Sequence, residues 1–134
     1  MKYSIQATAT AKKDAAMHIK QSDINFGTTP ESSDSLPNPA ELFLGSFSAC
    51  VLKNVERFSG FMHFDYTKAE ITVNAIRLEK PPRMDEIQYH LRIYTKDNTL
   101  NIDLLKKNIE KFGTIFNTVK LSCAITGDIQ LITN

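Results

Sequence analysis

Two cysteines are the residues of this chain best suited to chemistry. Cys50 lies in an apolar stretch and Cys123 lies near the C-terminus, so 73 positions (123 minus 50) separate them. If folding brings them together, one sulfur can attack a peroxide and the other can resolve the resulting sulfenic acid as a disulfide, as in a thiol peroxidase. Alternatively, Cys50 packs as a small hydrophobic side chain between Phe47 and Val51. The chain has no CxxC pair, which argues against a zinc ribbon or a thioredoxin-type site.

Composition narrows the classes of partner that we expect. The chain has 134 residues with 42% hydrophobic content and a net charge of +1. Basic residues do not cluster, which argues against nucleic-acid binding, and no apolar run reaches the roughly 18 residues of a membrane span. The three histidines are dispersed, without metal-ligand spacing. We therefore expect a soluble cytoplasmic protein without a metal site or a membrane partner, in a compartment where paired cysteines are redox-active or simply reduced.

A long helix must position Cys50. Asn38 is a predicted N-cap, Pro39 suits the first helical position, and Glu41 completes a capping box three residues after the cap. The helical spacing of apolar residues continues to Met62, and the first three turns are apolar nearly all round. This predicts a central helix covered by a sheet on one side and by a second subunit of a homodimer on the other.

The remaining pattern predicts a single α+β domain over residues 1–134. Strands are expected at 3–9, 69–78, 87–94 and 129–131, with a loop at 27–37. Residues 17–19 and 24–26 form two short strands or one bent strand, and the pattern at 69–78 indicates a bulge or burial on both faces. A second helix is predicted over 102–112 with Gly113 as its C-cap, and a short third helix from about Asn117 to Ala124, closed by Gly127.

These residues resemble the OsmC/Ohr family of peroxide-reducing proteins. The resemblance is carried by Asn-Pro-x-Glu-Leu-Phe at 38–43, by Ser-Ala-Cys at 48–50, and by a second cysteine just before the final strand. It implies the OsmC-like fold, with antiparallel sheets packed around a long central helix in an intertwined homodimer. It also implies reduction of organic hydroperoxides by Cys50, resolution by Cys123, and regeneration by a dithiol reductant, without metal or organic cofactor.

Three positions depart from the usual family pattern. No arginine precedes Arg57, so the early turn offers Lys12 and Lys13 instead, and we take Lys13 as the cation that favours the Cys50 thiolate. Glutamate stands at Glu41, one position later than usual, where it caps the helix, serves the active site, or does both. Cys123 is followed by alanine rather than proline. These departures leave one alternative function open, namely a non-catalytic dimer of the same fold that binds a small ligand.

Overall fold

A computed structural model describes residues 1–133 of the chain. The chain separates into two compact units, Met1–Phe43 and the part from Leu44 onward. The single OsmC-like domain over residues 1–134 stays a prediction.

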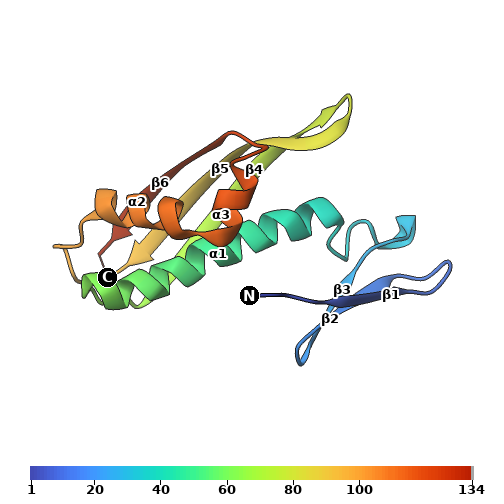
Figure 1. The fold of residues 1–134 in the computed structure, drawn as a ribbon, viewed down its shortest axis with the longest axis horizontal. Coiled ribbons are helices and arrows are strands. Elements are labelled where there is room, and N and C mark those ends of the chain that lie inside the picture. Colours follow the sequence, from blue (N-terminus) through green and yellow to red (C-terminus); the bar gives the residue numbers. More distant parts are fainter. Residues whose placement is uncertain (134) are drawn as a thin grey trace. The chain divides into compact units, whose positions relative to one another are not determined.

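The first unit is an antiparallel sheet, and the loop that follows its last strand is hydrogen-bonded to one of its turns. The strands β1 (Gln6–Ala9), β2 (Ala15–Ile19) and β3 (Ser22–Phe26) lie in the order β1-β2-β3 (Figure 1). The loop after β3 contains a 3-10 turn, η1 (Pro30–Ser32). Asp14 Oδ1, beside the β1–β2 turn, accepts hydrogen bonds from the backbone N–H groups of Thr28 (3.0 Å) and Thr29 (3.2 Å) and from the Ser32 hydroxyl (2.7 Å). The Ser32 hydroxyl, and then the Thr28 N–H, hold the pKa of Asp14 below its usual value.

The second unit contains a mixed sheet. The strands β4 (Lys68–Glu79), β5 (Pro82–Tyr94) and β6 (Ile125–Ile132) lie in the order β4-β5-β6. β4 and β5 are antiparallel, and their register shifts between Asn74 and Ile76, which agrees with a bulge, one of the two alternatives predicted for this strand. β5 and β6 are parallel, so the prediction of antiparallel sheets is wrong for this pair. The physical reason is the crossover: two helices connect β5 to β6, and a crossover returns the chain in a parallel direction.

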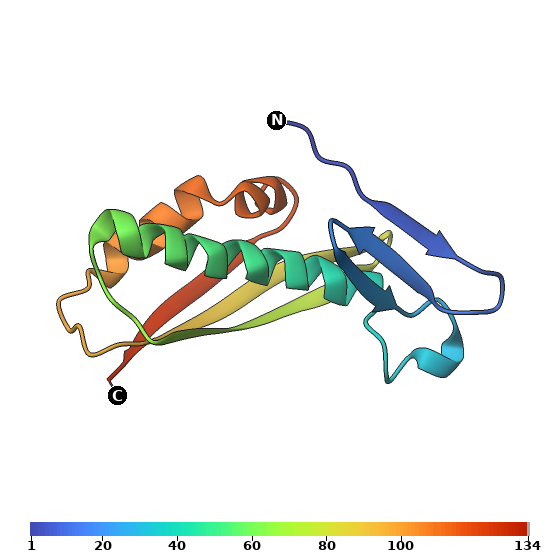
Figure 2. The same cartoon turned by 90° about the horizontal axis from the view of Figure 1, so that it is seen from below.

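Helices cover one face of this sheet. They are α1 (Pro39–Met62), whose course crosses the boundary between the units, α2 (Ile102–Phe112) and α3 (Thr114–Val119) (Figure 2). The β5 side chains alternate as predicted, because Ile87, Tyr89, Leu91 and Ile93 are at most 1% exposed. They pack in the core of this unit with Phe47, Val51, Val55, Leu105 and Ile109. Among the described residues, none of the helices combines the length and apolar character that a membrane span requires.

The third helix differs from its prediction. α3 begins at Thr114 and ends at Val119, rather than running from Asn117 to Ala124. Phe116 and Val119, three residues apart, are buried, and they define the face that holds this helix against the core. Gly127 does not close the helix but lies within β6, where the ring of Tyr89 occupies the space that a side chain would need.

Candidate functional site

The predicted capping box starts α1. The Asn38 N–H donates to Glu41 Oε1 at 3.0 Å, and the Glu41 N–H donates to Asn38 Oδ1 at 2.8 Å. This reciprocal pair satisfies two backbone donors that have no partner inside the helix. The capping role of Glu41 is therefore confirmed, whereas an active-site role for its carboxylate stays a prediction.

Cys50 lies half-buried on α1, against the corner between α2 and α3. A Cβ built on Gly113 would lie 3.1 Å from Cys50 Sγ, 3.0 Å from Phe116 Cβ and 2.9 Å from the Ile109 carbonyl oxygen. Gly113 has φ −72° and ψ 115°, an extended conformation that any residue can adopt. Glycine is therefore needed here for space, since it lets the backbone of the α2–α3 corner approach the thiol.

Asn54 places an amide donor beside Cys50. It lies one turn further along α1 and is 7% exposed. Its Nδ2 donates to the Cys50 carbonyl oxygen at 2.9 Å and, more weakly, to Cys50 Sγ at 3.8 Å. An amide nitrogen has two hydrogens, so both bonds can form at once. The Asn54 side chain therefore offers the Cys50 sulfur a hydrogen-bond donor from the same helix.

Cys123 lies in a contrasting environment. It is 9% exposed and immediately precedes the short lead into β6, as the sequence predicted. Its Sγ lies 3.3 Å from the Met84 carbonyl oxygen and donates to it, and its backbone N–H donates to the Val119 carbonyl oxygen at 2.9 Å. The Cys123 sulfur is therefore engaged as a hydrogen-bond donor, a role that uses its S–H group.

The helix α3 links the surroundings of the two thiols. Gly113, at its N-cap, lies against Cys50, and Val119, its last residue, binds the backbone of Cys123. A helix of this length spans about 9 Å. Both cysteines are free thiols, and their pairing stays a prediction. Sequence reasoning missed Asn54 and the contact of Gly113 with Cys50, although a polar residue one turn after Cys50 on an apolar helix was a visible signal.

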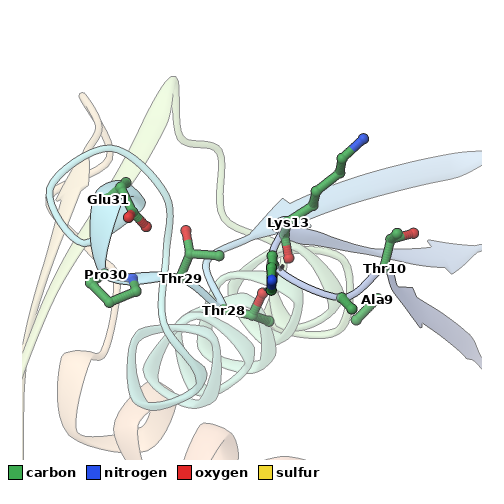
Figure 3. A pocket seen from close by; sticks show the side chains of 9 residues that line it. Ala9, Thr10, Lys13, Thr28, Thr29, Pro30 and Glu31 are labelled. Carbon is green, nitrogen blue, oxygen red and sulfur yellow. Dashed lines mark hydrogen bonds between the residues drawn. The ribbon is translucent and has the colours of Figure 1, made fainter.

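Lys13 belongs to the β1–β2 turn of the first unit. Its N–H donates to the Thr10 carbonyl oxygen at 3.0 Å, and its own carbonyl oxygen accepts from the Thr28 hydroxyl at 2.8 Å. The turn lines an open pocket of about 630 Å³. Figure 3 shows the exposed Lys13 side chain extending outward from this turn. Activation of Cys50 by Lys13 therefore stays a prediction. Within residues 1–133, no three His, Cys, Asp or Glu side chains are grouped as metal ligands.

Solved structures of other proteins share the fold of this chain. Three of those that align over nearly the whole chain illustrate the similarity. The OsmC-like protein of Mycoplasma pneumoniae is 18% identical, with 98% of each chain covered and a TM-score of 0.87. The organic hydroperoxide resistance protein OsmC of Legionella pneumophila is 13% identical, with 96% of this chain and 97% of that chain covered and a TM-score of 0.72. The organic hydroperoxide resistance protein OhrB of Bacillus subtilis is 15% identical, with 96% and 98% covered and a TM-score of 0.61.

At these low identities, it is the TM-scores over nearly the whole chain that establish a shared fold. A search of curated proteins finds no match. The family of OsmC-like proteins matches residues 32–127, a segment that includes both cysteines and all three helices. Since this match covers well over half of the sequence, the chain belongs to the OsmC-like protein family.

Proposed function

We propose that this protein reduces organic hydroperoxides, with Cys50 as the peroxidatic thiol and Cys123 as the resolving thiol. Membership of the OsmC-like family supports the proposal, as do similar folds in proteins named for organic hydroperoxide resistance. The observation that carries it is the contrast between the two sulfurs. Cys50 Sγ accepts from the Asn54 amide, whereas Cys123 Sγ donates to the Met84 carbonyl. The Asn54 amide thus supplies a donor at the Cys50 sulfur, whereas the Cys123 sulfur is itself engaged as a donor to a backbone carbonyl.

The proposed cycle has three steps. The Cys50 thiolate attacks the distal oxygen of the hydroperoxide and breaks the O–O bond, which gives Cys50 sulfenic acid and an alkoxide that is protonated to the alcohol. The Cys123 sulfur then attacks the sulfenic sulfur, and water leaves as the disulfide forms. An external dithiol reduces this disulfide to the two thiols and is itself oxidised to a disulfide.

The proposal assigns supporting roles to the two remaining predicted site residues. The Lys13 ammonium supplies positive charge near the Cys50 thiolate, contributed across the interface of a homodimer. Glu41 orients that ammonium in addition to capping α1. Lysine would hold the thiolate as a point charge, without the planar fork of an arginine. We place this cycle in the cytoplasm, where dithiol reductants keep thiols reduced.

Steady-state consumption of tert-butyl hydroperoxide with dithiothreitol tests the proposal. We expect wild type to consume the hydroperoxide well above the rate of dithiothreitol alone, and Cys50→Ser to fall to that background. Cys123→Ser should still react once per subunit but turn over slowly, because its sulfenic acid lacks an internal partner. Equal background rates for wild type and Cys50→Ser would instead leave the non-catalytic, ligand-binding alternative.

A further inference from the structure

A second cavity lies in the second unit, between the last turns of α1 and the face of α2. It has a volume of about 340 Å³, and its lining residues are Arg57, Phe58, Phe61, Met62, Asn108 and Phe112. Phe61 is 69% exposed and Phe112 is 45% exposed, so two aromatic walls of this cavity face solvent. An open cavity with apolar walls and a few polar groups is the usual form of a small-molecule site.

Arg57 is held over the aromatic walls. Its guanidinium carbon lies 5.5 Å from the ring centroid of Phe58, 5.7 Å from that of Phe61 and 5.9 Å from that of Phe112. These cation–π contacts orient the guanidinium over the aromatic rings. In the part of the chain that the structure describes, no carboxylate forms an ion pair with Arg57. Its N–H groups are thus available to an external acceptor.

The other polar groups at the cavity also favour a ligand that is negatively charged and accepts hydrogen bonds. The Lys111 ammonium lies 5.3 Å from the Phe112 ring centroid and adds a second positive charge. No acidic side chain is among the described residues that line the cavity. Asn108 Nδ2 donates to Met62 Sδ at 3.6 Å, and this thioether sulfur is a weak acceptor. The Asn108 amide has a second hydrogen that can be donated to a ligand. The cavity therefore combines apolar walls with cationic groups and hydrogen-bond donors.

We propose that this cavity binds a small monocarboxylate with an apolar body. The carboxylate pairs with the Arg57 guanidinium, and the hydrocarbon part lies on Phe61, Met62 and Phe112. Arginine is the side chain best suited to this recognition, because its planar fork matches the two oxygens of a carboxylate. Neither cysteine lines the cavity, so the inference does not depend on the proposed peroxidase activity.

Octanoate is the probe for this site, and isothermal titration calorimetry and saturation-transfer NMR are the readouts. We expect octanoate to bind wild type and 1-octanol, which has the same chain without the charge, to bind at least about tenfold more weakly. Arg57→Gln should weaken octanoate binding about 10- to 100-fold, the value of a hydrogen bond to a charged group. Arg77→Gln, which removes an exposed arginine on β4 paired with Glu79, is the matched control and should bind like wild type.

Two further variants complete the test. Arg57→Lys keeps the charge without the fork and should bind octanoate more tightly than Arg57→Gln does. Cys50→Ser should bind octanoate as wild type does, which separates this inference from the thiol chemistry. No binding of octanoate at millimolar concentration, equal binding of 1-octanol, or unchanged binding by Arg57→Gln would each overturn the proposal. A loss of affinity in Arg57→Lys as large as that in Arg57→Gln would overturn it as well.

Discussion

Gly113→Ala probes the close approach of the α2–α3 corner to Cys50. The new Cβ would lie 2.9 Å from the Ile109 carbonyl oxygen, 3.0 Å from Phe116 Cβ and 3.1 Å from Cys50 Sγ. The sulfur can move by rotation about χ1, but the backbone oxygen and the Phe116 Cβ can move only with their helices. We therefore expect the corner to shift and the Cys50 side chain to be displaced.

The change in the free energy of unfolding caused by Gly113→Ala follows from two opposing effects. Overpacking of this kind costs roughly 1–3 kcal/mol. Alanine adopts the backbone conformation of Gly113 without strain. Because alanine has less conformational freedom than glycine in the unfolded chain, this term stabilises the folded state by roughly 0.4–1 kcal/mol. We expect the free energy of unfolding to fall by about 1–2 kcal/mol, the difference between these two ranges near their centres.

Urea denaturation measures this change, and Gly60→Ala is the matched control. Gly60 lies within α1, and a Cβ built on it meets nothing within 4 Å. Alanine there should raise the free energy of unfolding by about 0.5–1 kcal/mol, because it favours the helix. In a Cys123→Ser background, Gly113→Ala should also change the alkylation rate of native Cys50. If Gly113→Ala is as stable as wild type and alkylates at the same rate, the described contact with Cys50 is wrong.

Three further predictions concern pH and packing. The pKa of Asp14 is lowered in the folded state, so its stabilising contribution is present above the unfolded pKa of 3.8 and is lost as pH falls through the lower folded pKa. Asp14→Asn should therefore flatten the dependence of the urea midpoint on acid pH. An unchanged slope would exclude this role. Burial, and then the hydrogen bond that its hydroxyl donates to Glu56, raise the pKa of Tyr66 from 10.0 to about 12, so its contribution is present below pH 10 and is lost as pH rises toward 12. Tyr66→Phe should reduce the alkaline loss of stability and remove one phenolate that forms above pH 10 in an ultraviolet titration. A Tyr66 that ionises near pH 10 would contradict this. A Cβ at Gly127 would overlap the ring of Tyr89, which is 0% exposed. Gly127→Ala should therefore lower the free energy of unfolding by about 3 kcal/mol or more, measured by thermal unfolding. A melting temperature equal to that of wild type would refute this packing.

Local signals predicted the elements that position the thiols. The Asn38 cap with Glu41 three residues later specifies the start of α1, because the motif satisfies backbone donors within one turn. The alternation from Ile87 to Ile93 indicates β5, because one face of a strand lies on the core and the other faces away. Both patterns depend only on neighbours in the sequence.

Features set by distant residues were not accessible in this way. The parallel pairing of β6 with β5 depends on the path of the crossover, and the bounds of α3 depend on which side chains the core accepts. Gly127 resembles a helix stop in the sequence, but it is required by the ring of Tyr89 from another strand. The approach of Gly113 to Cys50 joins residues of different helices, and no local pattern encodes that contact.

Mass spectrometry after a single turnover tests the central proposal most directly. Fully reduced protein is mixed with one equivalent of tert-butyl hydroperoxide, quenched with an alkylating agent and digested. Our account predicts a disulfide-linked peptide pair containing Cys50 and Cys123, and, in Cys123→Ser, a sulfenic acid at Cys50 that dimedone traps. Unmodified Cys50 in both proteins, or oxidation at Cys123 with Cys50 still reduced, would contradict the assignment of the peroxidatic thiol.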